Sequence, residues 1–549
     1  MPALPVDIPS PVKEYLLVSS KGTKRLLKVV EHLVLGEPLA EVEQERSRIR
    51  LISDLALAAW EHSPFDLVAC STLSQLHEQA PFLPGEVAEA VRRGAIPPQC
   101  GPAVMHALDT AFKHSQASEE ISTFLDSTRN LEPNSLFWMH FACTFALAEN
   151  KLDWFSEFLT NQKGLPPYLR RIVQGDILFA QEQWERAMEK YQEASSRFES
   201  PGLMIRKAEA LYRAGHRAEA TQLWQSAFAA RTWDYTLALR LGDILQERDL
   251  PQQEPHGQGA VLLYSWNHAQ DLDIALSSLA ATTPPNIPLL LLDNGSSDDT
   301  AMVSQRWKRE LGNRLSLITL PVNIGAPAAR NWLLSTPLLS RFDWVVFLDD
   351  DAVVPQNWLN YFGTAMKEYP NAGIFGCQVK DLFAPQIIQS ADLHYEQPLS
   401  PASKGIGGPN FTVSNFHAQV PARGEHDYMR MCVSVTGCCH LVTRPNLDAV
   451  GHFNLMFSPS QFDDYERDIR SGIKGFLPVY NGHLTVQHRK RSGLIKNIGR
   501  QTAANVNGNS LKAQNLYSED QMESLRQLDM ANLKARLDEC LHVIYAVSS

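Results

Sequence analysis

Cysteine is scarce in this sequence, and its spacing excludes two classes of protein. Eight cysteines are scattered over 549 residues, and the only close pair is the adjacent Cys438 and Cys439. No two cysteines stand in a CxxC arrangement, so a paired-cysteine zinc motif is excluded, and their density is too low for a disulfide framework. We therefore expect a protein of a reducing compartment, and we place it in the cytoplasm.

Long apolar runs and an excess of basic residues are also absent. No uninterrupted apolar stretch approaches the roughly 18 residues of a transmembrane helix, and the start, MPALPVDIPSPVKEY, lacks the basic and apolar regions of a secretory signal. The 50 basic and 61 acidic residues give a net charge of −11. This charge argues against a general nucleic-acid binder but not against a nucleotide as a small ligand. We expect no membrane span and no nucleic-acid partner.

The first 250 residues have the composition and periodicity of helices, and an internal repeat lies near their end. GDILFAQEQWERAMEKYQEA (175–194) and AEALYRAGHRAEATQLWQSA (208–227) superpose at an offset of 33 residues. A third copy begins at LGDILQER (241–248). Small residues where helices touch, with an aromatic residue in the next layer, resemble the tetratricopeptide repeat. Two interpretations remain open: a plain stack of helices, or a solenoid whose concave surface holds a peptide or protein.

After a polar break at DLPQQEPHGQG (249–259) the pattern changes to alternating strands and helices. Short apolar runs such as IPLLLLDNG (287–295) and DWVVFLDDD (343–351) alternate with helical stretches. This alternation is typical of an α/β domain with a mostly parallel sheet covered on both faces. Ligands of such sheets bind beyond the carboxyl ends of the strands, so we look for the site in the polar residues that end them.

The run FLDDDAVVP (347–355) places three aspartates directly after a buried strand. Carboxylates this close repel one another unless a cation lies between them, and Mg²⁺ and Mn²⁺ prefer oxygen ligands. In an extended chain Asp349 and Asp351 project to one side and Asp350 to the other. The pattern predicts a divalent metal site, and the alternative is an exposed acidic turn.

A haloacid-dehalogenase-type phosphatase also uses a strand that ends in D-x-D. Residues 349–353 satisfy its DxDx(T/V) signature, with Asp349 as nucleophile, Asp351 as general acid and base, and Asp464 and Asp468 as a late acidic pair. That signature normally follows the first strand of its domain. Here two βα units precede the aspartates, which argues against the phosphatase.

From about 260 to 490 the chain resembles glycosyltransferase family 2, whose catalytic domain has the GT-A fold. Six motifs keep the order of that family, and one motif alone would carry little weight. They are VLLYSWNHAQDLDIALSSL, LLLLDNGSSDDT, VNIGAPAARNWLL, FLDDDAVVPQNWL, TGCCHLVTRPNLDAVGHFN (436–454) and DDYERDIRSGIKGF (463–476). The resemblance implies an inverting transferase that uses a nucleotide-sugar donor, UDP- or GDP-linked, and Mn²⁺ or Mg²⁺.

The resemblance also implies a role for each matched residue. Asp464 would be the catalytic base. The donor nucleotide would contact Tyr264, Ser265, Asn267, Asp293, Asn294, Asn323, Gly325, Arg330, Asp349 and Asp350, although Asp350 points away from its two neighbours. The metal would be held by Asp349, Asp351 and His488, the acceptor or sugar by Asp463, Glu466 and Gly437, and the diphosphate by Arg489 and Lys490. For His488 and the basic run 489–491 a packed residue and a solvated turn remain the alternatives.

We predict a multidomain protein with an N-terminal all-α repeat domain, a Rossmann-like GT-A domain and a C-terminal helical tail. A Ser518/Gln521 capping box begins the last helix, and the Gly-, Pro- and Ser-rich stretch 385–430 has the pattern of a mobile loop. The predicted boundaries are 1–165 for a helical domain that could contain degenerate repeats, 166–250 for tetratricopeptide-like repeats, 251–259 for the linker, 260–495 for the transferase and 496–549 for the C-terminal extension.

We expect the protein to transfer a hexosyl or N-acetylhexosaminyl group to a protein or peptide acceptor that the helical repeats recruit. A glycan or lipid-linked acceptor remains open at this point. The alternative of another class is a repeat scaffold with an inactive transferase-like domain, which the intact acidic residues argue against.

Overall fold

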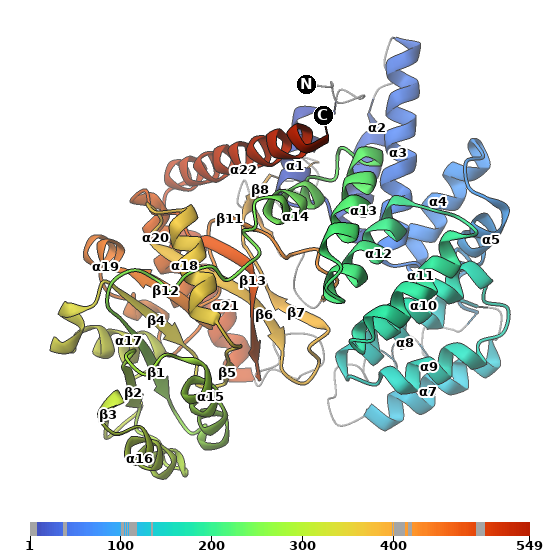
Figure 1. The fold of residues 1–549 in the computed structure, drawn as a ribbon. Helices are drawn as coiled ribbons and strands as arrows, with labels where there is room; N and C mark the ends of the chain where they lie inside the picture. The colour runs from blue at the N-terminus through green and yellow to red at the C-terminus, as the bar shows by residue number, and fades with distance from the viewer. Residues whose placement is uncertain are drawn as a thin grey trace.

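A computed structural model gives the fold, in which a helical region lies beside an α/β region (Figure 1). The structure describes residues 8–36, 41–99, 104, 106, 108, 118–132, 135–397, 399, 412–414, 420–489 and 500–548. Within these ranges no helix has the length and apolarity that crossing a membrane requires.

The described residues between 8 and 250 form helices and turns without a strand, as the periodicity predicts. The helices are α1 (Ser10–Val18), α2 (Thr23–Leu35), α3 (Val42–His62), α4 (Leu67–Gln79), α5 (Gly85–Gly94), α7 (Ser118–Leu131), α8 (Phe137–Ala148), α9 (Leu152–Asn161), α10 (Pro167–Ala180), α11 (Trp184–Ser195), α12 (Pro201–Arg213), α13 (Arg217–Ala230) and α14 (Tyr235–Leu245). Their apolar faces share one core. The prediction of an all-helical N-terminal region is confirmed, and its assignment to the tetratricopeptide repeat stays a prediction.

The 33-residue offset corresponds to a repeated contact between paired helices. A Cβ on Gly175 of α10 would lie 2.4 Å from the Tyr191 ring of α11, so only glycine lets these helices approach so closely. At the equivalent positions Ala208 of α12 and Trp224 of α13 are both buried. The small and aromatic residues of the repeat therefore mark helix contacts.

The α/β region is built on a mixed sheet with helices on both faces. Its path runs β10-β7-β6-β12-β4-β1-β2-β3, in which β1, β2, β3 and β4 are parallel and β12 inserts antiparallel between β4 and β6. The strands of this sheet are β1 (Gly259–Ser265), β2 (Leu289–Asp293), β3 (Leu315–Thr319), β4 (Trp344–Leu348), β5 (Ala352–Val353), β6 (Ile374–Asp381), β7 (Ile387–Ser390), β10 (Val420–Pro421), β11 (Met429–Met431), β12 (Cys439–Thr443) and β13 (Val479–His488). Strands β8 (Tyr395–Glu396) and β9 (Thr412–Val413) pair with each other in a separate two-stranded sheet.

Two apolar layers, one on each face of the sheet, hold most of its helices in place, and a smaller apolar cluster joins the helix that starts at Asp463 to the last helix. The helices are α15 (Ala269–Thr282), α16 (Thr300–Leu311), α17 (Ala326–Leu334), α18 (Trp358–Glu368), α19 (Arg444–Val450), α20 (Asp463–Ile473), α21 (Arg500–Asn515) and α22 (Glu519–Ser548), with short 3₁₀ turns at Gly312–Arg314, Pro337–Arg341 and Leu455–Phe457. The predicted α/β domain and C-terminal helix are confirmed.

The prediction of an irregular loop over 385–430 is wrong for the part that the structure describes. Strands β7, β8 and β10 form there, and Asp392 and His394 are fully buried. Tertiary pairing with β6 outweighs the weak local pattern. Residues 400–411 and 415–419 of this stretch lie outside the described residues.

The last helix, α22, begins with the predicted capping box and joins the two regions. Ser518 N donates to Gln521 Oε1 at 3.0 Å, and Gln521 N donates to Ser518 Oγ at 3.3 Å. Further along, α22 packs on α14: a Cβ on Gly242 would lie 2.5 Å from Cys540 Sγ. Gly242 lies at the start of the third sequence repeat. In the first two repeats the partner helix is the next helix of the chain, whereas in the third repeat the partner helix is α22.

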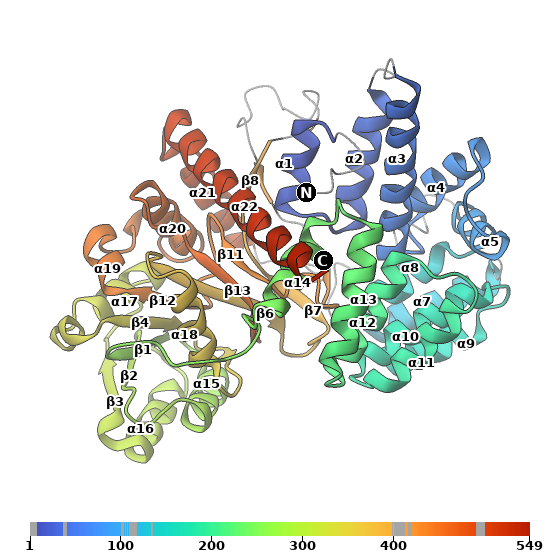
Figure 2. The ribbon, with the colours of Figure 1, turned by 45° about the horizontal axis from the view of Figure 1, so that its top comes forward.

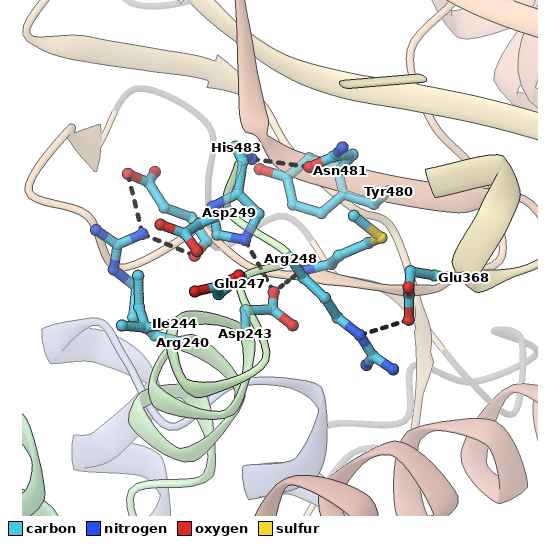
Figure 3. Close-up of polar contacts among 12 residues, drawn as sticks. Arg240, Asp243, Ile244, Glu247, Arg248, Asp249, Glu368, Tyr480, Asn481 and His483 are labelled. Atoms are coloured by element: carbon cyan, nitrogen blue, oxygen red, sulfur yellow. Dashed lines mark hydrogen bonds and ion pairs between the residues drawn. The ribbon is translucent and has the colours of Figure 1, made fainter. Parts of the chain in front are cut away.

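One buried carboxylate, Asp243 of α14, ties three parts of the chain together. Figure 3 shows its contact with His483. Asp243 forms an ion pair with Arg536 of α22 and lies 2.9 Å from His483 Nε2 of β13. Its Oδ2 also accepts a hydrogen bond from the Met429 backbone of β11 at 2.6 Å. Nearby, Arg248 pairs with Glu368 of α18 at 2.7 Å. The helical region is thereby fixed to the sheet through charged hydrogen bonds.

A second buried network holds the first and last helices against the same side of the sheet. His394 lies 3.0 Å from Asp529 of α22 and 2.8 Å from Asp392. Arg430 donates to Asp392 at 2.6 Å and to the carbonyl of Val18 at the end of α1 at 2.7 Å. Burial alone would lower the pKa of His394, but the two carboxylates raise it.

Replacing Asp243→Ala tests whether this junction stabilises the protein. The change leaves Arg536 and His483 buried without their carboxylate, and breaking a buried ion pair costs about 3–5 kcal/mol. We expect a lower melting temperature in calorimetry and faster proteolytic cleavage at α22. The exposed Asp538→Ala on α22 is the control and should change neither readout. Equal melting temperatures for the two variants would contradict the role of Asp243.

Candidate active site

The predicted donor residues gather at the carboxyl ends of β1 and β2. Asp293, 1% exposed, ends β2 and accepts a hydrogen bond from Ser296 N at 3.0 Å. Asn294 N donates to the Ser265 carbonyl at the end of β1 at 2.8 Å. Asn267, in a left-handed conformation, accepts from Ser297 N at 2.7 Å. These bonds join the two strand-end loops into one surface.

An amide ladder then fixes the start of α17. Asn294 Nδ2 donates to Asn323 Oδ1 at 2.9 Å, and the same oxygen accepts from Gly325 N at 2.8 Å. Gly295 has a φ of 73°, and a Cβ there would lie 2.3 Å from the Val322 backbone. Glycine is therefore required where the β2 loop passes this turn. The ladder sets where the following helix, and with it Arg330, enters the site.

Arg330 of α17 is the buried positive charge of the site. Its guanidinium is 2.5 Å from Asp463 Oδ2 and 3.3 Å from Asp349 Oδ1, and it lies over the Tyr264 ring at 5.3 Å. Burial raises the pKa of Asp349 to about 6, against the opposing charge of Arg330. Burial, together with the neighbouring Asp464, also raises the pKa of Asp463. The arginine therefore links the end of β4 to the start of α20.

His488, the last residue of β13, faces both outer aspartates of the triple run. Its Nε2 lies 3.0 Å from Asp351 Oδ1 and 4.0 Å from Asp349 Oδ2. The residue is brought there because β13 pairs with β5, placing His488 opposite Ala352. The structure therefore assembles the three predicted metal ligands.

Gln389 of β7 fixes which nitrogen of His488 faces these carboxylates. Its Oε1 lies 3.1 Å from His488 Nδ1, while its Nε2 donates to Asp381 Oδ2 at 3.3 Å. Because the carboxylate only accepts, the amide oxygen must face the histidine, and Nδ1 must donate. Nε2 is then the nitrogen left to meet Asp351, where it needs a proton or a cation between the two groups. A metal ion fits that position.

Cys438 also lies in this cluster, with Asp349 and His488, and all three ligand atoms are within 4.8 Å of one another. Burial raises the pKa of its thiol well above the usual value, so the sulfur is neutral. Neutral thiols are poor ligands for hard cations, whereas two carboxylates and an imidazole suit Mn²⁺ or Mg²⁺. The donor set therefore fits a hard divalent ion held by Asp349, Asp351 and His488.

Asp350 and Arg489 face the start of α15 instead. Asp350 Oδ1 lies 3.6 Å from His268 Nδ1, and this neighbouring carboxylate raises the pKa of that histidine to about 9. Arg489 pairs with Asp271 at 2.7 Å. Two of the predicted contacts are thus already engaged with α15, and Lys490 lies outside the described residues.

The amino end of α20 forms the opposite wall. Asp464, half-buried, accepts a hydrogen bond from Gly437 N at 2.7 Å, and a Cβ on Gly437 would collide with it. Glu466 points elsewhere: it pairs with Arg470 and accepts from the Tyr517 hydroxyl at 2.7 Å. Both of its oxygens are occupied by these partners, which gives it a structural environment. Of the predicted acceptor-side residues, Asp463, Asp464 and Gly437 come together.

Sequence reasoning missed three residues of this site: His268, Gln389 and Asp381. Gln389 lies in the stretch 385–430, where no sequence pattern distinguishes it, and it reaches His488 from 99 positions away. His268 follows the β1 loop as a single histidine. Only the pairing of β6 with β7 and β13 brings Gln389 and Asp381 to His488.

Gln389→Leu tests the orienting role of this amide. Loss of a hydrogen bond that orients a metal ligand typically weakens metal affinity about 10- to 100-fold. We expect that loss for Mn²⁺, measured by electron paramagnetic resonance of free Mn²⁺. Asp351→Asn should lower the Mn²⁺ affinity further. Gln356→Leu, at an exposed position in the same region, should leave the Mn²⁺ affinity unchanged. Unchanged Mn²⁺ affinity of Gln389→Leu would show that the amide does not orient a ligand.

Comparisons with known proteins match parts of the chain. A search of curated proteins gives no match. Similar solved structures include GalNAc-T7 with UDP, GalNAc and Mn²⁺ (TM-score 0.33, 11% identity), where the match covers 44% of this chain and 45% of that one. Another is the mannosyltransferase PcManGT from Pyrobaculum calidifontis with GDP-Man and Mn²⁺ (TM-score 0.34, 13% identity, 60% of this chain and 87% of that one). Residues 260–415 match the glycosyl transferase family 2 model.

Proposed function

We propose that the protein is a metal-dependent inverting glycosyltransferase that uses a nucleotide-sugar donor. The observation that carries the proposal is the convergence, within and just beyond the matched segment 260–415, of three groups around Arg330: the strand-end donor residues, the Asp349, Asp351 and His488 cluster, and Asp464. Donor, metal and base are the three functions that such a transfer requires.

The donor side of the reaction follows from the strand ends. Asp293 and the backbone of Tyr264 and Ser265 would hold the base and ribose, and Asn267 shapes the adjoining turn. A divalent ion held by Asp349, Asp351 and His488 would stabilise the negative charge of the departing diphosphate. Arg489, beside Asp351 in the backbone, could exchange its pairing with Asp271 for a phosphate oxygen.

The acceptor side depends on Asp464. Its carboxylate would take the proton of the acceptor hydroxyl while that oxygen forms a bond to the anomeric carbon and the bond to the diphosphate breaks. Gly437 N holds the carboxylate in place, and only glycine at this position leaves room for the carboxylate to approach. Attack on the face opposite the leaving group inverts the anomeric carbon.

The finer assignments belong to the same proposal. The transferred group would be a hexosyl or N-acetylhexosaminyl unit, and the transferase would extend from about 260 to 495. The acceptor would be a protein or peptide that the tetratricopeptide-like helices recruit, which is supported by their rigid attachment to the sheet through Asp243.

The geometry is less favourable to the phosphatase alternative. Asp349, which would be the nucleophile of the phosphatase, contacts Arg330. Asp468, one residue of the late acidic pair that the phosphatase would use, is buried. Asp468 accepts from Ser434 Oγ and Val435 N, and burial raises its pKa to about 8. A carboxyl group engaged in this way has no free oxygen pair for the cation that the phosphatase needs.

Calorimetric titration with UDP and GDP tests the donor proposal. We expect one of the two nucleotides to bind in MnCl₂ and to lose at least tenfold in affinity in chelator, because the diphosphate then meets unscreened carboxylates. Asp351→Asn should reproduce the effect of the chelator. Absence of Mn²⁺-dependent binding for both nucleotides would refute the proposal.

Asp464→Asn separates binding from chemistry. An amide of the same shape retains a carbonyl oxygen for the Gly437 N–H but cannot take a proton, so nucleotide affinity should stay unchanged. Turnover, followed as nucleotide release from a screen of sugar nucleotides, should fall about 10²- to 10⁴-fold. The control Asp448→Asn, exposed on α19, should retain both. A parallel loss of affinity and turnover would argue that Asp464 serves in donor binding instead.

A further inference from the structure

A cavity of about 1020 Å³ lies between the helical region and the sheet. Its helical wall comes from α8, α9 and α10, and its other wall from β6, β7 and β10. Both ribbon views place the helical region on the β6–β7 side of the sheet (Figures 1 and 2). This volume is at the upper end of that of ligand sites, which usually hold about 300–1,000 Å³.

The two walls differ in chemistry. The helices contribute mainly apolar side chains, among them Leu147, Phe155 and Ile177, whereas the sheet contributes Lys380 and Gln386. Strand β10, the end of the described sheet path, also lines the cavity at Val420 and Pro421. An edge strand beside an apolar wall suits an extended polypeptide, which can use both its backbone and its side chains there.

The cavity is positively charged although the chain is acidic overall. Six basic and four acidic side chains line it, in a protein whose net charge is −11. Four of the six cations are already paired: Arg213 with Asp427, Arg423 with Asp176, Lys21 with Asp234, and Arg25 with Glu396. Those pairs leave their cations little capacity for a ligand, so the charge that a ligand would meet must come from elsewhere.

Lys380, near the end of β6, supplies that charge. Within the described part of the chain its ammonium group has no hydrogen bond or ion pair, and burial lowers its pKa. A partly desolvated ammonium without a partner favours an anion strongly, because the anion restores the solvation that burial removed. Lys24, exposed at the start of α2, adds a second cation without a partner in the described residues.

The cavity and the metal cluster share a wall. Gln389 lines the cavity and also lies 3.1 Å from His488 Nδ1, and the neighbouring residue of Lys380, Asp381, holds the Gln389 amide. A chain bound against this wall therefore lies one side chain away from a predicted metal ligand.

We propose that this cavity binds an acidic segment of a polypeptide acceptor, with a carboxylate of that segment paired to Lys380. This inference rests on the proposed transferase function, whose acceptor class it narrows. The apolar helical wall packs the side chains of the segment, and the β10 edge meets its backbone. Only two cations lack partners in the described lining, which is too few for a nucleic-acid backbone.

Fluorescence anisotropy with labelled peptides tests the proposal on the full chain. The probes are a peptide of four Glu-Ala repeats and its Gln-Ala counterpart, and neither needs a sugar donor. We expect the acidic peptide to bind at least tenfold more tightly, because a carboxylate forms a charge-assisted hydrogen bond with the partly desolvated ammonium and a neutral amide does not. Equal binding of both peptides would overturn the proposal.

Two variants locate the site. Lys380→Gln should weaken binding of the acidic peptide at least tenfold and leave the Gln-Ala peptide unchanged, while Lys534→Gln, exposed on α22, should change neither. If Lys380→Gln lowers the melting temperature, Lys24→Gln is the deciding variant, because the Lys24 side chain is exposed and its replacement should not affect folding. Lys24→Gln should weaken binding of the acidic peptide and leave binding of the Gln-Ala peptide unchanged. Unchanged affinity in a folded Lys380→Gln protein, or in Lys24→Gln where that variant decides, would overturn the assignment.

Two further measurements separate this inference from its alternatives. A labelled oligouridine of eight nucleotides that bound as tightly as the acidic peptide, with the same dependence on Lys380, would overturn the choice of a polypeptide. Mn²⁺-dependent nucleotide binding is measured on the same samples. Nucleotide binding without peptide binding would refute the cavity proposal alone, and peptide binding without nucleotide binding would refute the transferase function while the cavity site stands.

Discussion

The buried guanidinium of Arg330 is the interaction on which the rest of the site depends. Asp349, Asp351, Asp463 and Asp464 converge from two distant segments, and carboxylates so close could not fold together without a countercharge. Arg330 contacts Asp349 and Asp463 directly, at 3.3 and 2.5 Å. It therefore holds the end of β4, which carries the metal ligands, against the start of α20, which carries the predicted base.

The position of Arg330 is set by the loops that carry the predicted donor residues. The Asn294–Asn323 ladder and the tight turn at Gly295 decide where α17 begins, and Arg330 stands one helical turn beyond that start. Donor loop, metal strand and acceptor helix are thus connected through one helix. A shift of the β2 loop would be transmitted to the acidic cluster because the buried arginine pairs with both Asp349 and Asp463.

The sequence predicted well what depends on local pattern, and less well what depends on distant pairing. The 33-residue offset anticipated the contact of Gly175 with Tyr191 and the burial of the equivalent Ala208 and Trp224, and the capping box marked the start of α22. The sequence did not anticipate the contact of Glu466 with Tyr517, which is 51 positions away. It also did not anticipate the role of Gln389, whose stretch of sequence has no regular pattern. Such contacts arise from strand order and helix docking, which no short motif encodes.

Gln389 stands in the wall between the metal cluster and the cavity that separates the helical region from the sheet. This position suits a neutral amide. A glutamate there would add a carboxylate to an already crowded acidic group, and a lysine would repel a cation bound by His488. Glutamine can instead accept from the histidine on one side and donate to Asp381 on the other. An acidic cluster and an unpaired lysine can then lie close together without neutralising each other. The contacts of α22 and Asp243 fix the helical region to the sheet. The metal cluster and the cavity therefore keep the same position relative to each other.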